Sequence, residues 1–283
     1  MAYTTIDDPS EYFVTTLYAG NGNDDRSITN DANAGNFKPD WLWLKNRSGT
    51  NSHALVDSTR GPTKVLRSNA NNAEETEANG IQAFETDGFQ IGSGGLVNTD
   101  GNNYVAWQWK ANGGTTTTND ASATSVGTID SVYQANTTAG FSIVTYTGTG
   151  SAGTIAHGLG ATPKLYIIKN RERSDTWRVA TEMMGFGKQL LLNETDAVAT
   201  DTSTFNNTAP TSTVFSVGTR NAVNASSEGH VAYCFAEKKG YSKMGSYTGN
   251  GAQDGTFVYT GFKPAFILAK RTDAAKNWYI ADS

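Results

Sequence analysis

Three basic pairs and three ring-bearing residues are the side chains of this sequence whose type and spacing could bind a ligand. The basic residues end three similar apolar runs, as Lys45 and Arg47, Lys169 and Arg171, and Lys270 and Arg271. A ring follows eight positions after each lysine, as His53, Trp177 and Trp278. Aromatic rings offer a large amphipathic surface to sugars, and lysine and arginine pair with carboxylates. The pattern is therefore compatible with a glycan or partner contact in each repeat.

These residues also have a purely structural interpretation. Each basic pair can meet a carboxylate of its own repeat, for example Asp57 or Asp87, and each ring can pack against the hairpin that follows it. An exposed ion pair would stabilise the fold by only about 0–1 kcal/mol. Asp57 and Arg60 stand three residues apart in a compact Asp-Ser-Thr-Arg-Gly turn and can bridge locally. The sequence leaves the structural and the binding interpretations open.

Signals for catalysis or a cofactor are sparse. The three histidines, His53, His157 and His230, lie in separate segments without a cysteine, aspartate or glutamate at metal-ligand spacing. The glycine motifs lack the Gly-Lys-Ser/Thr of a phosphate-binding loop, and no closely spaced pair of strand carboxylates suggests a glycosidase. Turns rich in Asp and Asn, at 21–25 and 98–102, could hold calcium, although ordinary turn chemistry also accounts for them. We therefore expect no enzyme, no metal and no cofactor.

The elements that position the basic and ring residues occur three times. The segment Tyr18–Gly22 is echoed by Tyr146–Gly150 and Tyr247–Gly251. In each copy a proline then opens an apolar run and stands six positions before its lysine; these prolines are Pro39, Pro163 and Pro264. A module that is repeated with a drifting sequence indicates architecture and display, because one active site does not need three scaffolds.

Short apolar or alternating runs, separated by Asn-Gly, Asp-Gly and Gly-Gly turns, predict an all-β fold of tandem β-sandwich modules, of the jelly-roll kind. In the second and third copies, the run after the proline is apolar on both faces, which is typical of a central strand packed on both sides. Its positions accept any large apolar residue, which indicates core: Trp41, Leu165 and Phe266 correspond, as do Trp43, Ile167 and Leu268. The same argument makes Trp107 and Trp109 core, since the second copy has Tyr233 and Phe235.

The repeats divide the chain into four parts. We expect a first β-sandwich module over 1–112, a Thr/Gly-rich linker over 113–138 with too few apolar residues to pack, a second module over 139–240 and an incomplete third module over 241–283. The third copy ends at Asp282 and Ser283, which correspond to Asp57 and Ser58. Half a sandwich exposes apolar faces and open strand edges. We expect either further sequence or another chain to supply the missing strands.

Composition restricts the partners. The net charge is −5 and no more than two basic residues stand together, which argues against nucleic acid. The single cysteine, Cys234, excludes an intrachain disulfide. No apolar run approaches the roughly 20 residues of a membrane span, and the N-terminus lacks the features of a signal peptide. We expect synthesis in the cytoplasm and no membrane insertion.

Five segments carry a further signal, namely 3–13, Lys38–Arg47, Asp57–Gly61, Asp87–Gly92 and Tyr104–Gly113. These segments resemble structural proteins of marine tailed bacteriophages, particularly those that infect cyanobacteria. The resemblance covers the first module closely and the other two in outline. It implies a repeat-bearing fibre or appendage protein with lectin-like, concanavalin A-like β-sandwich modules, and it implies no catalytic residues. The second module lacks the Asp-Ser-x-Arg-Gly turn, so any role of that turn does not extend to it.

The residues and the resemblance together lead to one main expectation. The protein is expected to be a structural protein of a virion, a tail fibre or surface appendage for assembly and host attachment. Its partners would be other virion proteins and a host surface glycan, and a homotrimer is the favoured oligomer. The main alternative is a carbohydrate-binding, lectin-like module that uses His53, Trp177, Trp278 and the basic pairs Lys45/Arg47 and Lys169/Arg171. A polysaccharide depolymerase is the third class.

Overall fold

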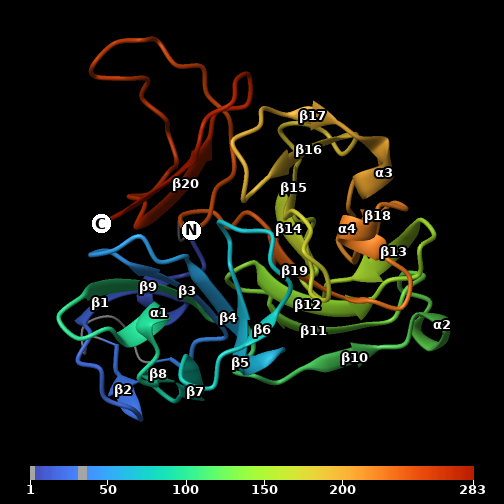
Figure 1. Cartoon of the computed structure of the whole chain (residues 1–283). Helices are drawn as coiled ribbons and strands as arrows, with labels where there is room; N and C mark the ends of the chain where they lie inside the picture. The colour runs from blue at the N-terminus through green and yellow to red at the C-terminus, as the bar shows by residue number, and fades with distance from the viewer. Residues whose placement is uncertain (1–3, 31–36) are drawn as a thin grey trace.

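The computed structural model describes residues 4–30 and 37–283, and it consists mainly of antiparallel sheets arranged in three bodies (Figure 1). In the first module, a short η1 (Pro9–Glu11) precedes a large sheet with the order β1-β9-β3-β4-β5-β6. Its strands are β1 (Phe13–Ala19), β3 (Trp41–Asn46), β4 (Ala54–Asp57), β5 (Gly61–Leu66), β6 (Glu75–Thr76) and β9 (Asn103–Trp109). The expectation of an all-β sandwich fold is confirmed.

A small sheet and a one-turn helix cover one face of this large sheet. The small sheet has the order β2-β8-β7, with β2 (Arg26–Ile28), β7 (Ile81–Glu85) and β8 (Gly88–Ile91), and the helix is α1 (Gly95–Asn98). The predicted Asp87-Gly88 turn joins β7 to β8. It requires glycine, because Gly88 has φ 109° and a Cβ there would lie 2.0 Å from the carbonyl oxygen of Ile28.

The second module repeats this plan with a wider sheet. The order is β10-β11-β12-β19-β14-β15-β16-β17, and the small sheet that covers one face pairs β13 with β18. The bounds of these strands are β10 (Thr117–Asn119), β11 (Ser131–Asn136), β12 (Phe141–Thr147), β13 (Gly153–Ala156), β14 (Leu165–Asn170), β15 (Arg178–Thr181), β16 (Lys188–Leu191), β17 (Ala199–Thr200), β18 (Val214–Val217) and β19 (Gly229–Phe235). Three further helices, α2 (Ala121–Thr124), α3 (Thr202–Phe205) and α4 (Asn221–Asn224), are one turn long. None of the helices in the described part of the chain could span a membrane.

The segment 113–138 is not an unpacked linker, so this expectation is wrong. It supplies β10, α2 and β11, and β11 pairs with β12 from Ser131↔Tyr146 to Asn136↔Phe141. Ile129 is buried and forms a β-bridge to Ile155. Pairing with β12 satisfies the backbone of this polar segment, so few large apolar side chains are needed to hold it.

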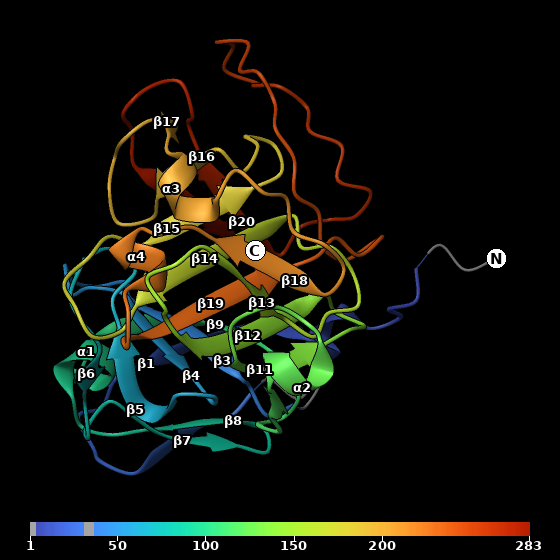
Figure 2. The same ribbon diagram turned by 90° about the vertical axis from the view of Figure 1, so that its right-hand side faces the viewer.

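The third module consists of one hairpin and a long loop. Its strands are β20 (Phe266–Lys270) and β21 (Trp278–Asp282), which pair with each other. Residues 243–262 contain no strand and project away from the body as a loop in both views (Figure 2). The hairpin nevertheless packs on the rest of the molecule through Phe266, Trp278 and Ile280.

The large sheets of the first two modules pack against each other through the faces that their small sheets do not cover. Both faces of β3 are therefore buried, and its residues 41–44 are each at most 3% exposed. One face contributes Trp41 and Trp43 to a core that all three modules share, and the other packs in the first module's own core. Trp41 stacks on Tyr233 with ring centroids 4.3 Å apart. The prediction of core tryptophans is confirmed.

The prediction of a central strand packed on both sides is confirmed for β14, whose Tyr166, Ile167 and Ile168 are buried. It is wrong for β20, where Ile267 is 47% exposed because no small sheet in the described part of the chain covers that face.

Candidate functional site at the junctions of the modules

The rings that follow the repeated lysines join each module to the preceding one. Trp177 donates from Nε1 to the carbonyl oxygen of Arg67, over 2.9 Å, and so links the second module to the first. Trp278 donates to the carbonyl oxygen of Leu191, over 2.7 Å, and links the third module to the second. The two acceptors are equivalent in strand register. Arg67 follows Leu66, which pairs with Leu55, and Leu191 follows Leu190, which pairs with the equivalent residue Val179.

A backbone hydrogen bond repeats at the same two junctions. The N–H of Glu74 donates to the carbonyl oxygen of Arg171 over 2.7 Å, and the N–H of Val198 donates to that of Thr272 over 2.9 Å. Glu74 and Val198 each precede a short edge strand, β6 or β17, and both acceptors lie two residues after a repeated lysine. The second module therefore sits on the first as the third sits on the second.

A third repeated hydrogen bond also connects the first module to the third, so that the three modules form a ring of contacts. Tyr233 of β19 donates from its hydroxyl to Asp57 over 2.7 Å, and Trp107 of β9 donates from Nε1 to Asp282 over 2.9 Å. Tyr233 and Trp107 are equivalent, since they pair with Ile167 and Trp43. Asp57 and Asp282 are equivalent as well, because they pair with Trp41 and Phe266. Each module thus contacts both others, in the same cyclic sense, within one chain.

A buried ionic cluster reinforces the junction of the first and second modules. Arg60 is fully buried and contacts Asp57 at 2.5 Å and Glu74 at 2.8 Å, which confirms the predicted local bridge in the Asp57–Gly61 turn. Arg171 of the second module holds the other oxygen of Glu74 at 2.8 Å. Burial lowers the pKa of Arg60, but the neighbouring charges of Asp57 and Glu74 outweigh burial and hold that pKa above its ordinary value. Burial raises the pKa of Glu74, but the two arginines bring it below its ordinary value.

The repeated lysines bind backbone carbonyl groups, so the expected pairing with a carboxylate of their own module is wrong for them. It is confirmed for the third basic pair through Arg271, which pairs with Asp273 at 2.7 Å. Lys45 donates to the carbonyls of Asn46, Gly49 and Asn51 over 2.7–3.0 Å. Lys169 is buried and donates to two carbonyls of its own turn, and burial lowers its pKa to about 8. Lys270 likewise donates to two carbonyl groups, one of them in the second module. Lys45 and Lys169 therefore close the turns after their strands, whereas Lys270 links its strand to the second module.

The ring residues differ in exposure. Trp177 is fully buried, because the first module covers it. Trp278 and His53 are partly exposed. His53 accepts a hydrogen bond at Nδ1 from the indole of Trp43 over 2.8 Å, and burial together with nearby Lys45 lowers its pKa to about 4. A glycan contact at His53, Trp278, Lys45 or Arg47 stays a prediction, whereas Trp177, Lys169 and Arg171 are engaged in structural contacts.

Sequence comparison gives a family without an activity. The sequence profile of a family described as a domain of unknown function, DUF7483, matches residues 8–283. The chain belongs to the DUF7483 family. No curated protein and no solved structure matches it.

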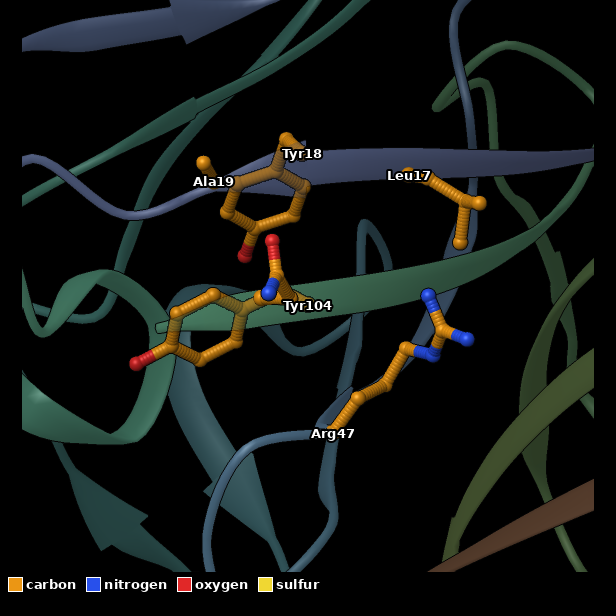
Figure 3. A pocket seen from close by; sticks show the side chains of 6 residues that line it. Leu17, Tyr18, Ala19, Arg47 and Tyr104 are labelled. Carbon is orange, nitrogen blue, oxygen red and sulfur yellow. The ribbon is translucent and has the colours of Figure 1, made fainter. Parts of the chain in front are cut away.

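A shallow hollow lies on the first module of this DUF7483 chain. A pocket of about 250 Å³ is lined by Leu17, Tyr18, Ala19, Arg47, Asn103 and Tyr104, and Figure 3 shows the two tyrosine rings facing each other beside Arg47. The tyrosine rings stack at 5.1 Å, and their hydroxyls donate to the carbonyls of Val97 and Gly95. Tyr146 and His230 form the same stack at 5.1 Å in the second module. The stack is therefore a repeated structural feature, and Arg47 is the charged side chain that lines this pocket.

Burial shifts the pKa values of two histidines and of the cysteine in the DUF7483 fold. Burial lowers the pKa of His157 to about 4, and His230, stacked on Tyr146, has its pKa lowered by burial too. Burial raises the pKa of the Cys234 thiol, which keeps it protonated and unreactive at neutral pH. Within residues 4–30 and 37–283, no three metal-ligating side chains gather at one place. The contacts at the junctions hold the modules in place relative to one another.

Sequence reasoning missed three participants of the junctions: Glu74, Tyr233 and the carbonyl of Arg67. Glu74 and Tyr233 lie 97 and 176 positions from their partners Arg171 and Asp57. A signal was present for one contact, because aspartate recurs at the equivalent positions 57 and 282. The backbone acceptors leave no mark in the sequence.

Proposed function

We propose that the protein is a non-enzymatic structural component of a bacteriophage virion, a tail fibre or surface appendage that serves assembly and host attachment. The observation that supports a structural role is the ring of equivalent contacts among the three modules. The side chains that looked suited to binding or chemistry, above all Trp177, Arg171 and Asp57, fasten one module to another. The virion role comes from the resemblance to appendage proteins of tailed phages.

The proposed mechanism is mechanical. Each junction combines apolar packing in the shared core with hydrogen bonds whose partners lie far apart in the sequence, so pulling one module away must break several contacts together. A rigid body of this kind can carry load and hold outer surfaces at fixed spacing. Several copies on one virion would turn weak single contacts with a host into strong avidity.

The ring also bears on the proposed oligomer. One chain already brings three modules together around a shared core, so a threefold arrangement needs no second chain at this level. A homotrimer would join three such chains through outer surfaces. Its native mass, measured by light scattering, would be three times that of the chain of 30.2 kDa.

Electron microscopy tests the virion role. Purified particles of the phage that encodes the chain would be labelled with a gold-conjugated antibody raised against it. We expect label on fibres or appendages, at the tail or at the capsid, and loss of the label when the antibody is first absorbed with purified protein. Particles without label, alongside free protein in the lysate, would contradict the virion role.

Carbohydrate binding is the second candidate, and Arg47 at the mouth of the pocket is the observation that favours it. The guanidinium could pair with an acidic sugar, while Leu17, which is 61% exposed, offers an apolar contact beside it. A glycan array that gives a signal for the purified chain and loses it for Arg47→Ala would support this candidate. An array without signal, or a signal that survives the substitution, would remove it.

A further inference from the structure

The hairpin of the third module leaves uncovered a face that the other modules bury. Ile267 is 47% exposed, whereas the equivalent residues Leu42 and Tyr166 are 0% exposed. Tyr279 is 67% exposed, whereas the equivalent Ala54 is 1% exposed. In the first and second modules a small sheet covers this face, and in the third nothing in the described part of the chain does so. The uncovered face is apolar, which marks a surface for a partner.

The hairpin also has an open strand edge. In the complete modules, β3 pairs with β4 on one side and β9 on the other, and β14 pairs with β15 and β19. Over the described ranges, β20 pairs with β21 alone. Its other edge presents backbone groups that a further strand can pair with.

The loop of the third module fits the same picture. By sequence, Tyr247 is equivalent to Tyr146 of β12, a strand that is held in place by pairing with β19. Without a counterpart of β19, residues 243–262 form no strand, and they expose large rings: Tyr247 at 62%, Phe257 at 87% and Tyr259 at 72%. The exposed large apolar residues of the molecule thus gather mainly on this one module, at the place where one central strand is lacking.

In each complete module, one segment both covers the face of the large sheet and pairs with the second edge of the central strand. In the first module it runs through β8, α1 and β9, and in the second through β18, α4 and β19. The first strand of the segment covers the module's own face with a buried phenylalanine, Phe89 or Phe215. The last strand enters the large sheet and contributes Trp107 or Tyr233 to the shared core.

We propose that the third module is a docking site for a strand–turn–strand segment of a partner polypeptide, whose last strand adds antiparallel to the free edge of β20. Docking at a sheet edge of this kind takes its affinity from main-chain hydrogen bonds and its specificity from alternate side chains. The site is continuous with the shared core, because Phe266, Trp278 and Ile280 already pack against that core and are only partly buried. The proposal concerns the partner surface and holds whether or not the final assembly is a virion.

The register defines the chemistry of the incoming strand. Phe266 and Leu268 take the places of Trp41 and Trp43, which face Trp109 and Trp107 across the β3–β9 pair. The incoming strand should therefore carry aromatic residues at alternate positions, opposite Phe266 and Leu268. The ring opposite Leu268 would lie against Thr181, since Thr181 is equivalent to Asp57 and Asp282, the acceptors for Tyr233 and Trp107. A tyrosine or tryptophan there could hydrogen-bond to the Thr181 hydroxyl and complete the ring of equivalent contacts.

A synthetic peptide tests the docking site on the full chain. The probe has the sequence of residues 214–235 with Cys234→Ser, and a peptide with the residues of the β19 part scrambled is its control. We expect saturable binding by fluorescence anisotropy. We also expect the hydrogen exchange of the amides in Phe266–Lys270 to slow by about tenfold or more. Ile267→Asp should weaken binding about tenfold or more. Leu17→Asp, which replaces an exposed aliphatic residue on β1 of the first module, should leave binding unchanged.

A tethered version removes the dependence on peptide solubility. The same 214–235 sequence is joined to Ser283 through a Gly/Ser linker, with the scrambled sequence as its control. Slower exchange in β20 of the first fusion alone supports the proposal. Unchanged exchange in both the peptide mixture and the tethered chain overturns it, as does equal binding by Ile267→Asp. A chain that is dimeric on its own and already protects β20 would assign the face to a second copy and would also overturn it.

Discussion

Two junctions use equivalent hydrogen bonds to backbone carbonyls: the one between the first and second modules and the one between the second and third. They differ in how much of their tryptophan side chain is buried. Trp177 is fully buried at the first junction, and Trp278, which makes the equivalent bond, is partly exposed at the second. At the first junction two complete sheets meet, and Trp41 stacks on Tyr233 and Phe141. At the second, a two-stranded hairpin meets a complete sheet. The hydrogen bonds therefore set the relative placement of the modules, while the completeness of each sheet sets how much apolar surface the junction buries.

Charge also distinguishes the two junctions. The position of Glu74, which two arginines hold at the first junction, is occupied by Val198 at the second. Arg171 gives way to Thr272 in the same comparison. Both pairs keep the backbone bond between these positions. The first junction thus adds a buried ionic cluster to a contact that works without it, so charge is an addition to this architecture and not its basis.

Truncation of Trp177 and of Trp278 should show the difference between the two junctions most clearly. Trp177→Ala removes a fully buried ring and leaves the carbonyl of Arg67 without its donor, so we expect a loss of about 4 kcal/mol in the free energy of unfolding. Trp278→Ala, its matched control, should cost about half as much, because that ring is partly exposed. Urea unfolding followed by far-ultraviolet circular dichroism measures both. Equal losses would mean that burial does not distinguish the junctions.

The buried arginine gives the next largest effect. Arg60→Met keeps much of the side-chain volume but leaves Asp57 buried without its arginine and Glu74 with Arg171 alone, so we expect a loss of about 3 kcal/mol in the free energy of unfolding. Arg67→Met is the control from the same module. Arg67 pairs with Glu75 and Glu77 near the surface, and its loss should cost about 1 kcal/mol or less. If the two variants unfold at the same urea concentration, the cluster is not a stabilising part of the junction.

Acid should weaken the first junction and not the second. At neutral pH, Glu74→Gln should lower the free energy of unfolding by about 2 kcal/mol, the contribution of hydrogen bonds to a charged group. The folded-state pKa of Glu74 lies below its ordinary value, so the unfolded chain takes up the proton first and the stabilisation is lost as pH falls through the folded-state pKa.

Urea unfolding at a series of pH values measures this effect. The difference between the natural chain and Glu74→Gln should be constant above about pH 5 and shrink below it. The buried histidines titrate in both proteins and cancel in the difference. A difference that stays constant down to pH 3 would show that the carboxylate charge does not hold the junction. Val198→Gln at the second junction is the control and should give no pH-dependent difference.

The sequence predicts the individual modules well and their junctions poorly, for a physical reason. Period-two patterns and turn residues are local, so the strands around Trp41 and Trp107, and the burial of both rings, follow from the sequence. The partner of Trp177 does not, because its acceptor is a backbone carbonyl, and every residue has one. The strands of 113–138 were missed because their pairing with β12, more than their own apolar content, holds them. Comparison of the copies did identify the aromatic position that Trp177 and Trp278 share, but not the carbonyl group to which each donates.

The hydrogen bond between Trp107 and Asp282 should give the smallest effect on stability and the most localised effect on hydrogen exchange. Trp107→Phe removes the indole N–H that Asp282 accepts, and Asp282 lies at an exposed position, so we expect a loss of only about 1 kcal/mol in the free energy of unfolding. Hydrogen exchange should nevertheless accelerate in β21 and leave β15 unchanged, because the bond joins the first module to the third alone. Tyr233→Phe, the equivalent change at the first junction, should act in the opposite way: its hydroxyl is bound to buried Asp57 and Arg60, so exchange should accelerate around β4 and not in β21. If either variant loosened both hairpins equally, the contacts would not act as separate links of a ring, and the three modules would have to be treated as one cooperative body.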